Sequence, residues 1–416
     1  MKSQHVVVIG AGAIGTASAW YLTKAGWSVT LIDKETQGRG ATAGNCGLYS
    51  PSHTLPLAAP GALKETLHAL FRTESPLSIR PRIDFRLWAW LLRFAGRCNE
   101  KDMLDAAPAR EALIRSSGGL FAELREQEDL ECQWQDAGCL MIYKEARGLE
   151  AHAKKAALLD ERFGIKARRL DGAELETFEP ALLPNKTAGG WFYEGDSHMR
   201  PEALLQAWRK LLEKSGVDVR EDCEARTFLR DGNQARSLVT NQGELQADAY
   251  VLATGAWTPQ LEKELGASIP IQPGKGYSLT MPSPALAPLR PLIFEEAKVV
   301  ATPFRDGYRL GSTMEFAGYD TKIRQGRLSL LEKAATDYLR EPLCQPVQEE
   351  WYGWRPMTYD GKPILDRSPR LQNLLIAAGH NMLGLTMAPA TGKLVAEMLS
   401  ETEPHLDPTP YSLSRF

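Results

Sequence analysis

Three glycines and one acidic residue near the start of the chain have the spacing of a dinucleotide site. Gly10 permits a tight turn, Gly12 leaves room for a pyrophosphate, and Gly15 allows close packing of the next helix. Asp33 follows Gly12 by 21 residues, where a carboxylate accepts the ribose hydroxyls of the ligand and would repel a 2′-phosphate. The pattern therefore predicts a dinucleotide with free ribose hydroxyls.

Two apolar runs and an intervening helix must position these residues. Residues 6–9 are wholly apolar, which is typical of a strand buried on both faces of a parallel sheet, and residues 29–32 form a second such run. The stretch between them is predicted to be a helix that stops at Gly26. The free N–H groups at the start of this helix, and its dipole, would face the phosphates.

Two further patterns bear on whether the ligand is NAD or FAD. An NAD dehydrogenase usually continues with more strand–helix–strand units, whereas here residues 39–47 form a loop of small residues. Such a loop either lies against a phosphate, a ribityl chain or a flat ring, or is simply a connection. Residues 248–257 read as a strand that ends in Thr254-Gly255, and residues 373–380 as a strand that leads into a helix over 387–399. The start of that helix suits the negative charge that a reduced flavin gathers.

Five segments, in the family's order, carry a resemblance to a known group of proteins. They are SAWYLTKAG (18–26), AGNCGLYSP (43–51), KGYSLT (275–280), WRPMTYDGKPI (354–364) and GHNMLGLTM (379–387). The chain resembles the FAD-dependent D-amino-acid oxidase superfamily, which includes the glycine and sarcosine oxidases. Within it, the chain is most similar to bacterial D-amino-acid dehydrogenases of the small-subunit type. The resemblance implies FAD, bound non-covalently although Cys46 would lie beside the flavin ring.

The same resemblance, together with the glycine pattern, gives a set of expected cofactor contacts. These are Gly10, Gly12, Ala13, Ile14, Gly15, Asp33, Lys34, Thr42, Ala43, Asn45, Cys46, Gly47, Leu48, Ala225, Thr254, Gly255, Trp257, Gly379, Asn381, Leu383, Gly384, Leu385 and Thr386.

Three residues are candidates for contact with the substrate. Arg355 lies in a Gly-x-Arg-Pro stretch similar to the one that holds the family's substrate arginine, and a guanidinium binds a carboxylate through two parallel hydrogen bonds. The alternative is a structural arginine paired with Asp360. Tyr277 would hydrogen-bond the substrate, or else is an ordinary half-buried strand tyrosine. His53 would line the pocket, or else is a packed or surface group. We expect His380 to hold the loop over the flavin.

The chemistry that these groups suit is oxidation of an amino acid at Cα. A hydride passes to flavin N5, and the imine that remains is hydrolysed to a 2-oxo acid and ammonia. The leading hypothesis is a D-amino-acid dehydrogenase, with D-proline or a hydroxy-D-proline among its candidate substrates. Two alternatives stay open: a glycine- or sarcosine-type oxidase that releases peroxide, and a non-catalytic FAD-binding subunit of a larger dehydrogenase. We expect no metal, since HExxH and histidine ligand spacing are absent from the sequence.

The fold class expected is α/β, with a Rossmann-like (glutathione-reductase-like) FAD-binding domain and an α+β substrate domain. We assign residues 1–75, 190–265 and 350–416 to the first, and residues 76–189 and 266–349 to the second, which should hold a mixed or antiparallel sheet. Helices are predicted over 111–124 and 325–339. Strands are predicted over 277–281, 299–303 and 308–312.

Composition and charge limit the partners. A net charge of −3 with dispersed Lys and Arg offers no field for nucleic acid, and six cysteines without a CxxC pair suit reduced thiols in the cytoplasm. We expect no signal peptide before the first strand, and no apolar run reaches the length of a membrane helix. Residues 82–97 interleave aromatics with arginines. This segment is either a core helix or an interfacial helix that holds the protein at the inner membrane, near a quinone or other respiratory acceptor.

Overall fold

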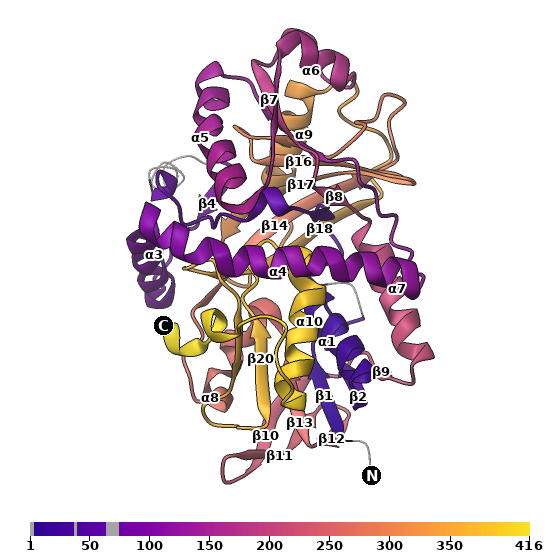
Figure 1. Ribbon diagram of the computed structural model, residues 1–416, viewed down its shortest axis with the longest axis vertical. Helices are drawn as coiled ribbons and strands as arrows, with labels where there is room; N and C mark the ends of the chain where they lie inside the picture. Colours follow the sequence, from indigo (N-terminus) through magenta and orange to yellow (C-terminus); the bar gives the residue numbers. More distant parts are fainter. Residues whose placement is uncertain (1–3, 37–39, 64–74) are drawn as a thin grey trace.

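The computed structural model describes residues 4–36, 40–63 and 75–416. Arg39, at the start of the small-residue loop, lies outside them. Figure 1 shows the long helix α4 (Glu100–Gln127) crossing the middle of the molecule, with one sheet below it and another above it. Among the described residues, no helix is long and apolar enough to cross a bilayer.

The lower sheet has six strands and is built around the N-terminal apolar run. Its order is β19-β20-β13-β1-β2-β9, and every neighbouring pair is parallel except β19 with β20. The strands are β1 (His5–Ile9), β2 (Ser28–Ile32), β9 (Asp218–Arg220), β13 (Ala249–Leu252), β19 (Ile364–Arg367) and β20 (Leu374–Ala378). Burial on both faces explains why β1, β13 and β20 are almost entirely apolar.

Helices α1 (Ala13–Lys24), α10 (Gly384–Ser400) and α7 (Pro201–Lys214) pack beside this sheet. Helices α1 and α10 approach closely because Gly392 has no side chain: a Cβ there would stand 2.5 Å from the Ala17 carbonyl carbon. The backbone N–H of Ala390 donates to Ser117 Oγ of α4 at 3.1 Å. This contact anchors the cofactor-side helix to the long central one.

A small antiparallel sheet and the chain's C-terminal turns complete the lower half. Strands β10 (Ala225–Asp231), β11 (Gln234–Thr240) and β12 (Gly243–Gln246) form the sheet. Phe228 and Leu238 of this sheet pack in one cluster with Tyr250 of β13.

The upper sheet has nine strands and is mixed. Strands β15 and β5, and β17 and β4, pair in parallel, while the other neighbours are antiparallel. Along the sheet the strands are β18 (Glu349–Thr358), β14 (Ile271–Met281), β17 (Gly307–Phe316), β16 (Val299–Phe304), β15 (Leu292–Phe294), β5 (Cys139–Tyr143), β7 (Gly189–Tyr193) and β6 (Arg168–Asp171), with β4 (Leu77–Ile79) beside β17. The predicted α/β class with a second, mixed sheet is confirmed.

The two faces of the upper sheet have different neighbours. One face packs on α9 (Gln325–Tyr338) and α6 (Gly172–Phe178) through a cluster that includes Tyr277, Leu279 and Leu331. The other face packs on α5 (Ala146–Phe163), and Ser278 Oγ on it donates to the Gly44 carbonyl at 2.8 Å. The second face therefore meets the predicted cofactor loop.

Helix α3 (Phe85–Arg97) lies along the edge of the molecule. Leu87, Trp90 and Phe94 are buried against Met314 and Met357. On another side of the helix, Phe85 is 85% and Leu92 74% exposed, and Trp88 is 41% exposed. One side of the helix therefore belongs to the core, as the first of the two predictions for residues 82–97 states, and another side is apolar and exposed.

Candidate functional site

The turn between β1 and α1 has the geometry that a pyrophosphate requires. Gly10 has a φ of +105°, and a Cβ on Gly15 would stand 1.7 Å from the Gly10 carbonyl oxygen. The helix starts at Ala13, whose N–H donates to Thr42 Oγ1 at 3.1 Å. No described group accepts from the N–H of Gly12 or Ile14. These free donors at a helix N-terminus fit an anionic phosphate.

The end of β2 supplies the groups expected around the adenosine. The Asp33 carboxylate accepts from the N–H of Ala11 at 2.7 Å, and burial raises its pKa. Lys34 Nζ lies 3.3 Å from the ring centre of Trp257, which lies in the 3-10 turn η2 (Gly255–Leu261) that follows β13. The Asp33 carbonyl accepts from Cys223, so the segment leading to Ala225 lies beside the same strand end.

The loop from Thr42 to Leu48 is fixed by the upper sheet. Arg309 of β17 is fully buried, and its Nη1 donates to the carbonyls of Ala43 and Asn45, each at 2.9 Å. Thr302 Oγ1 donates to the Cys46 carbonyl, and Asn45 Oδ1 accepts from Gly47. Arg309 also forms an ion pair with Glu202 of α7. Arg309 could not be found from the sequence, because it is a lone arginine in an ordinary strand pattern.

The loop before α10 brings a second helix N-terminus to the same region. Gly379 and Asn381 have positive φ values of 78° and 55°. Asn381 donates its N–H to the Pro356 carbonyl, and its side chain exchanges hydrogen bonds with Thr358. The residues expected to contact the cofactor, Leu383, Gly384, Leu385 and Thr386, follow at the start of α10, and Thr386 Oγ1 donates to the Leu48 carbonyl at 3.0 Å. This loop therefore lies beside the strand that carries Arg355.

His380 is buried within this loop. Its Nε2 lies 3.0 Å from Thr391 Oγ1, and burial lowers its pKa to about 3. A neutral histidine bonded to Thr391 of the following helix α10 suits the expected role of holding the loop.

Arg355 is half-buried on the face of the upper sheet that meets the cofactor loop. Its guanidinium lies across Gly276 of β14, where a Cβ would stand 2.4 Å from Nη1. Nη1 donates to the Thr313 carbonyl of β17 at 2.7 Å. Burial lowers the pKa of Arg355, and the Cys46 thiol is the ionisable neighbour that opposes this shift. Asp360, the alternative partner, instead pairs with Arg415 at 2.7 Å.

A bulge in β17 makes the Thr313 carbonyl available to Arg355. The pairing of β14 with β17 shifts register between Lys275 and Tyr277, and both Ser312 and Thr313 have positive φ values, 98° and 50°. Such backbone is costly for residues with a side chain and is often found at functional sites. The sequence carries no signal for this bulge.

Tyr277 lies on the other face of the sheet, which corrects its predicted contact with the substrate. It is 1% exposed, and its hydroxyl donates to Glu315 Oε2 at 2.6 Å. The alternation of side chains along β14 turns Tyr277 toward α9, while its neighbours Gly276 and Ser278 face Arg355 and the cofactor loop. The structure therefore does not bring Tyr277 together with Arg355.

His53 lies in a short 3-10 turn, η1 (Pro51–His53), that follows the cofactor loop. Its Nδ1 is 3.0 Å from Ser52 Oγ, and burial, assisted by the charge of Lys155, lowers its pKa to about 3. Ser52 donates to Asp196, whose pKa burial raises to about 7. His53 is thus a neutral group at neutral pH, in a buried polar cluster that the sequence did not reveal.

The site lies between two sheets and uses two helix N-termini, an arrangement that fits a dinucleotide-binding protein. Residues 5–398 match the family described as DAO, FAD dependent oxidoreductase. The chain belongs to the DAO family of FAD-dependent oxidoreductases. The resemblance inferred from the five segments, and FAD as the cofactor, are confirmed.

Individual proteins are similar over almost the whole chain. A D-amino acid dehydrogenase from Vibrio vulnificus (strain YJ016) is 33% identical over 410 residues, 96% of this chain and 98% of its own. One from Paramagnetospirillum magneticum is 36% identical over 403 residues, 95% and 94% of the two chains. The structure of glycine oxidase from Geobacillus kaustophilus matches with a TM-score of 0.79 at 23% identity, covering 100% of both chains. That last likeness concerns the fold alone.

Across the described ranges, no group of three or more His, Cys, Asp or Glu side chains could hold a metal ion. The glycine turn, the free N–H donors of α1 and the Arg309-held loop all fit FAD.

Proposed function

We propose that this protein is an FAD-dependent D-amino-acid dehydrogenase. The bound flavin would supply a two-electron acceptor for the hydride that leaves Cα, and water would hydrolyse the imine to a 2-oxo acid and ammonia. The observation that carries the proposal is the position of Arg355, on the sheet face that meets the cofactor loop and beside the start of α10.

In this proposal Arg355 binds the substrate carboxylate. Its Nη1 is held by the Thr313 carbonyl, so the guanidinium is oriented before the substrate arrives. No described carboxylate pairs with it, and the half-buried position strengthens its attraction for an anion. His53 lines the pocket as a neutral group and offers no positive charge against the substrate amine. Tyr277 does not contact the substrate.

The remaining assignments are also proposals. FAD is non-covalent, so acid precipitation should leave the yellow colour in the supernatant. The FAD-binding domain comprises 1–75, 190–265 and 350–416, and the substrate domain 76–189 and 266–349, except that β7 and β18, which these bounds place in the first domain, pair within the upper sheet. The cofactor contacts are those expected from the sequence. D-Proline and hydroxy-D-prolines stay candidate substrates, while the names of the relatives specify D-amino acids without a side-chain class.

We further propose that electrons pass to a quinone or other respiratory acceptor and that α3 holds the cytoplasmic protein on the inner membrane. The exposed Ile83, Phe85 and Leu92 alternate with arginines, of which Arg86 has a 73% exposed side chain. Apolar groups with interspersed cations are the features of an interfacial helix. Their location on one exposed segment supports this proposal.

The test is an assay of the purified holoenzyme with single amino acids and ferricyanide as acceptor. Formation of a 2-oxo acid and ammonia from D- but not L-amino acids is expected. Stoichiometric peroxide formation with glycine or sarcosine would instead establish an oxidase. Bound FAD without turnover of any amino acid would indicate a cofactor-binding subunit.

A further inference from the structure

The bulge in β17 that holds Arg355 is bridged by a hydrogen bond on the opposite face of the sheet. Tyr277 of β14 pairs with Ser312 at one end of the bulge, and Lys275 pairs with Glu315 at the other end. Two steps along β14 therefore lie opposite three steps along β17. The Tyr277 hydroxyl donates to Glu315 Oε2 at 2.6 Å. This bond thus ties the strand partner of one end of the bulge to the residue at the other end.

Both partners of this bond are buried. Tyr277 is 1% exposed and Glu315 is 3% exposed. Burial, and after it the hydrogen bond to Glu315, raises the pKa of Tyr277, so the hydroxyl keeps its proton and acts as the donor. A hydrogen bond to a carboxylate is shorter and stronger than one between neutral groups. A bond of this kind is strong enough to hold backbone in a costly conformation.

The bulge needs such support. Ser312 and Thr313 have φ values of 98° and 50°, which residues with a side chain keep only where the surrounding structure fixes them. A shift of the extra residue by one position would also turn the side chains of β17 to the other face of the sheet. The Thr313 carbonyl, which accepts from Arg355 Nη1 at 2.7 Å, would then point elsewhere.

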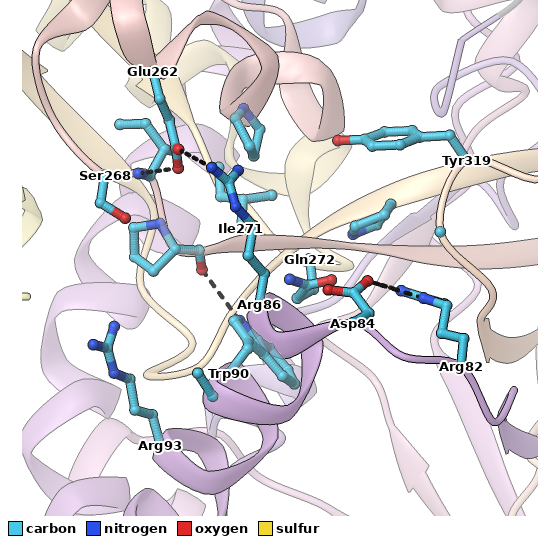
Figure 2. Close-up of a pocket in the computed structure, with 16 residues that line it drawn as sticks. Arg82, Asp84, Arg86, Trp90, Arg93, Glu262, Ser268, Ile271, Gln272 and Tyr319 are labelled. Atoms are coloured by element: carbon cyan, nitrogen blue, oxygen red, sulfur yellow. Dashed lines mark hydrogen bonds and ion pairs between the residues drawn. The ribbon is translucent and has the colours of Figure 1, made fainter.

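Other contacts anchor the two strands on either side of the bulge. The Trp90 indole N–H donates to the Pro270 carbonyl, just before β14, at 3.1 Å, and Arg82 Nη1 donates to the Phe316 carbonyl, at the end of β17, at 3.0 Å. Figure 2 shows Trp90 and Arg82 around the cleft between α3 and the start of β14. Lys275 Nζ donates to two carbonyls of the loop that follows β17. The Tyr277–Glu315 bond acts between these anchors, at the bulge itself.

We propose that Tyr277 and Glu315 are positioning residues for Arg355. The inference rests on the proposed function, in which Arg355 binds the substrate carboxylate. The Tyr277–Glu315 bond fixes the bulge, the bulge turns the Thr313 carbonyl toward Arg355, and that carbonyl orients the guanidinium before the substrate arrives. Tyr277 and Glu315 touch no substrate atom and act on carboxylate affinity from the far face of the sheet.

Tyr277→Phe tests the proposal, because it removes the hydroxyl and keeps the ring. Tyr338→Phe is the matched control. Tyr338 is 1% exposed, belongs to the same hydrophobic cluster and donates to Glu296 Oε2 at 2.8 Å, in the turn between β15 and β16. Each variant therefore loses a buried tyrosine–glutamate bond, but only one of the two bonds spans the bulge.

Three measurements are made on the purified holoenzymes. Urea denaturation gives the stability of each protein. Titration with pyruvate, followed by the change in the flavin absorption band, gives the affinity for a 2-oxo acid carboxylate without turnover. Oxidation of D-alanine with ferricyanide as acceptor gives KM and kcat.

We expect the two variants to lose similar stability and to keep their FAD. Only Tyr277→Phe should raise the Kd for pyruvate and the KM for D-alanine, by about fivefold to tenfold, with a smaller effect on kcat. Glu315→Gln keeps an acceptor for the Tyr277 hydroxyl and should show a smaller rise. The double variant should show no larger rise than Tyr277→Phe alone, because both changes act on one bond.

Equal pyruvate affinity in the parent and Tyr277→Phe would overturn the proposal, as would an equal rise of Kd in Tyr277→Phe and Tyr338→Phe. If pyruvate binds but no D-amino acid is oxidised, the proposed function alone fails, and the Kd values still decide the role of Tyr277. If the parent does not bind pyruvate, Arg355 is no carboxylate site, and the positioning role fails with it.

Discussion

The guanidinium of Arg355 occupies the space that a side chain at position 276 would need. A Cβ on Gly276 would stand 2.4 Å from Nη1 and 2.7 Å from Cζ of Arg355. The glycine in the KGYSLT segment thus lets an arginine from the adjacent strand lie across β14 and reach β17. Gly276 is therefore needed at this position because it has no side chain that would displace the Arg355 guanidinium.

Gly276→Ala should displace the guanidinium without removing its charge. A misplacement of about 1 Å can cost a hundredfold in rate, so we expect kcat/KM for a D-amino acid to fall between about tenfold and a hundredfold, mainly through KM. FAD content should be unchanged. Gly326→Ala, at a position where a Cβ meets nothing within 4 Å, is the control. Unaltered kinetics in Gly276→Ala would show that the observed arginine position is not the productive one.

Arg309→Lys should weaken the binding of FAD. Lysine cannot bond Ala43 and Asn45 while also reaching Thr280, and a hydrogen bond to a charged donor contributes about 1.5–3 kcal/mol. We expect the Kd for FAD, measured by titration of the apoprotein, to rise at least tenfold. Arg305→Lys, at a side chain 61% exposed, should behave as the parent. Identical FAD affinity in the two variants would mean that the loop holds its shape without Arg309.

Asp196 should make the protein less stable as the pH rises. Its pKa is raised from 3.8 to about 7, so between these values the folded state holds a proton that the unfolded chain has released. The free energy of unfolding must therefore fall across this window, by up to about 4 kcal/mol at 1.4 kcal/mol per pKa unit.

Asp196→Asn should remove that fall. Urea denaturation of parent and variant at pH 4.5 and pH 8 measures it, and the difference between the two proteins isolates Asp196 from His53, which titrates in the opposite sense. Parallel pH dependences would contradict a raised pKa at Asp196.

Phe85→Ser combined with Leu92→Ser should reduce membrane binding. Burial of each side chain in the interface contributes about 1.5–3 kcal/mol, so co-sedimentation with anionic vesicles at low salt should fall at least tenfold. Leu229→Ser, which alters an exposed leucine of the β10–β11 hairpin, is the control. If the parent itself stays in the supernatant, α3 has another role.

Local patterns predicted the nucleotide half of the molecule well. The alternation of apolar strands with Gly10, Gly12 and Gly15 depends only on short-range geometry, and α1 and β2 lie where it placed them. Predicted helices over 111–124 and 325–339 correspond to α4 and α9, although α4 is much longer.

Other features depend on contacts between distant segments and could not be predicted. Which face of β14 carries Tyr277 depends on the register of β14 with β17, and a bulge at Ser312–Thr313 interrupts that register. Arg309 meets the cofactor loop more than 260 positions earlier in the chain. None of these leaves a periodic or local signal in the sequence.

The most direct test of the account is anaerobic reduction of the flavin in the purified protein, in the parent and in Arg355→Lys. The parent's visible flavin band should bleach with D-amino acids and not with their L-enantiomers, whereas Arg355→Lys, with FAD still bound, should need at least a hundredfold more substrate. Bleaching of both proteins at the same D-amino-acid concentration, or no bleaching of the parent by any D-amino acid, would contradict it.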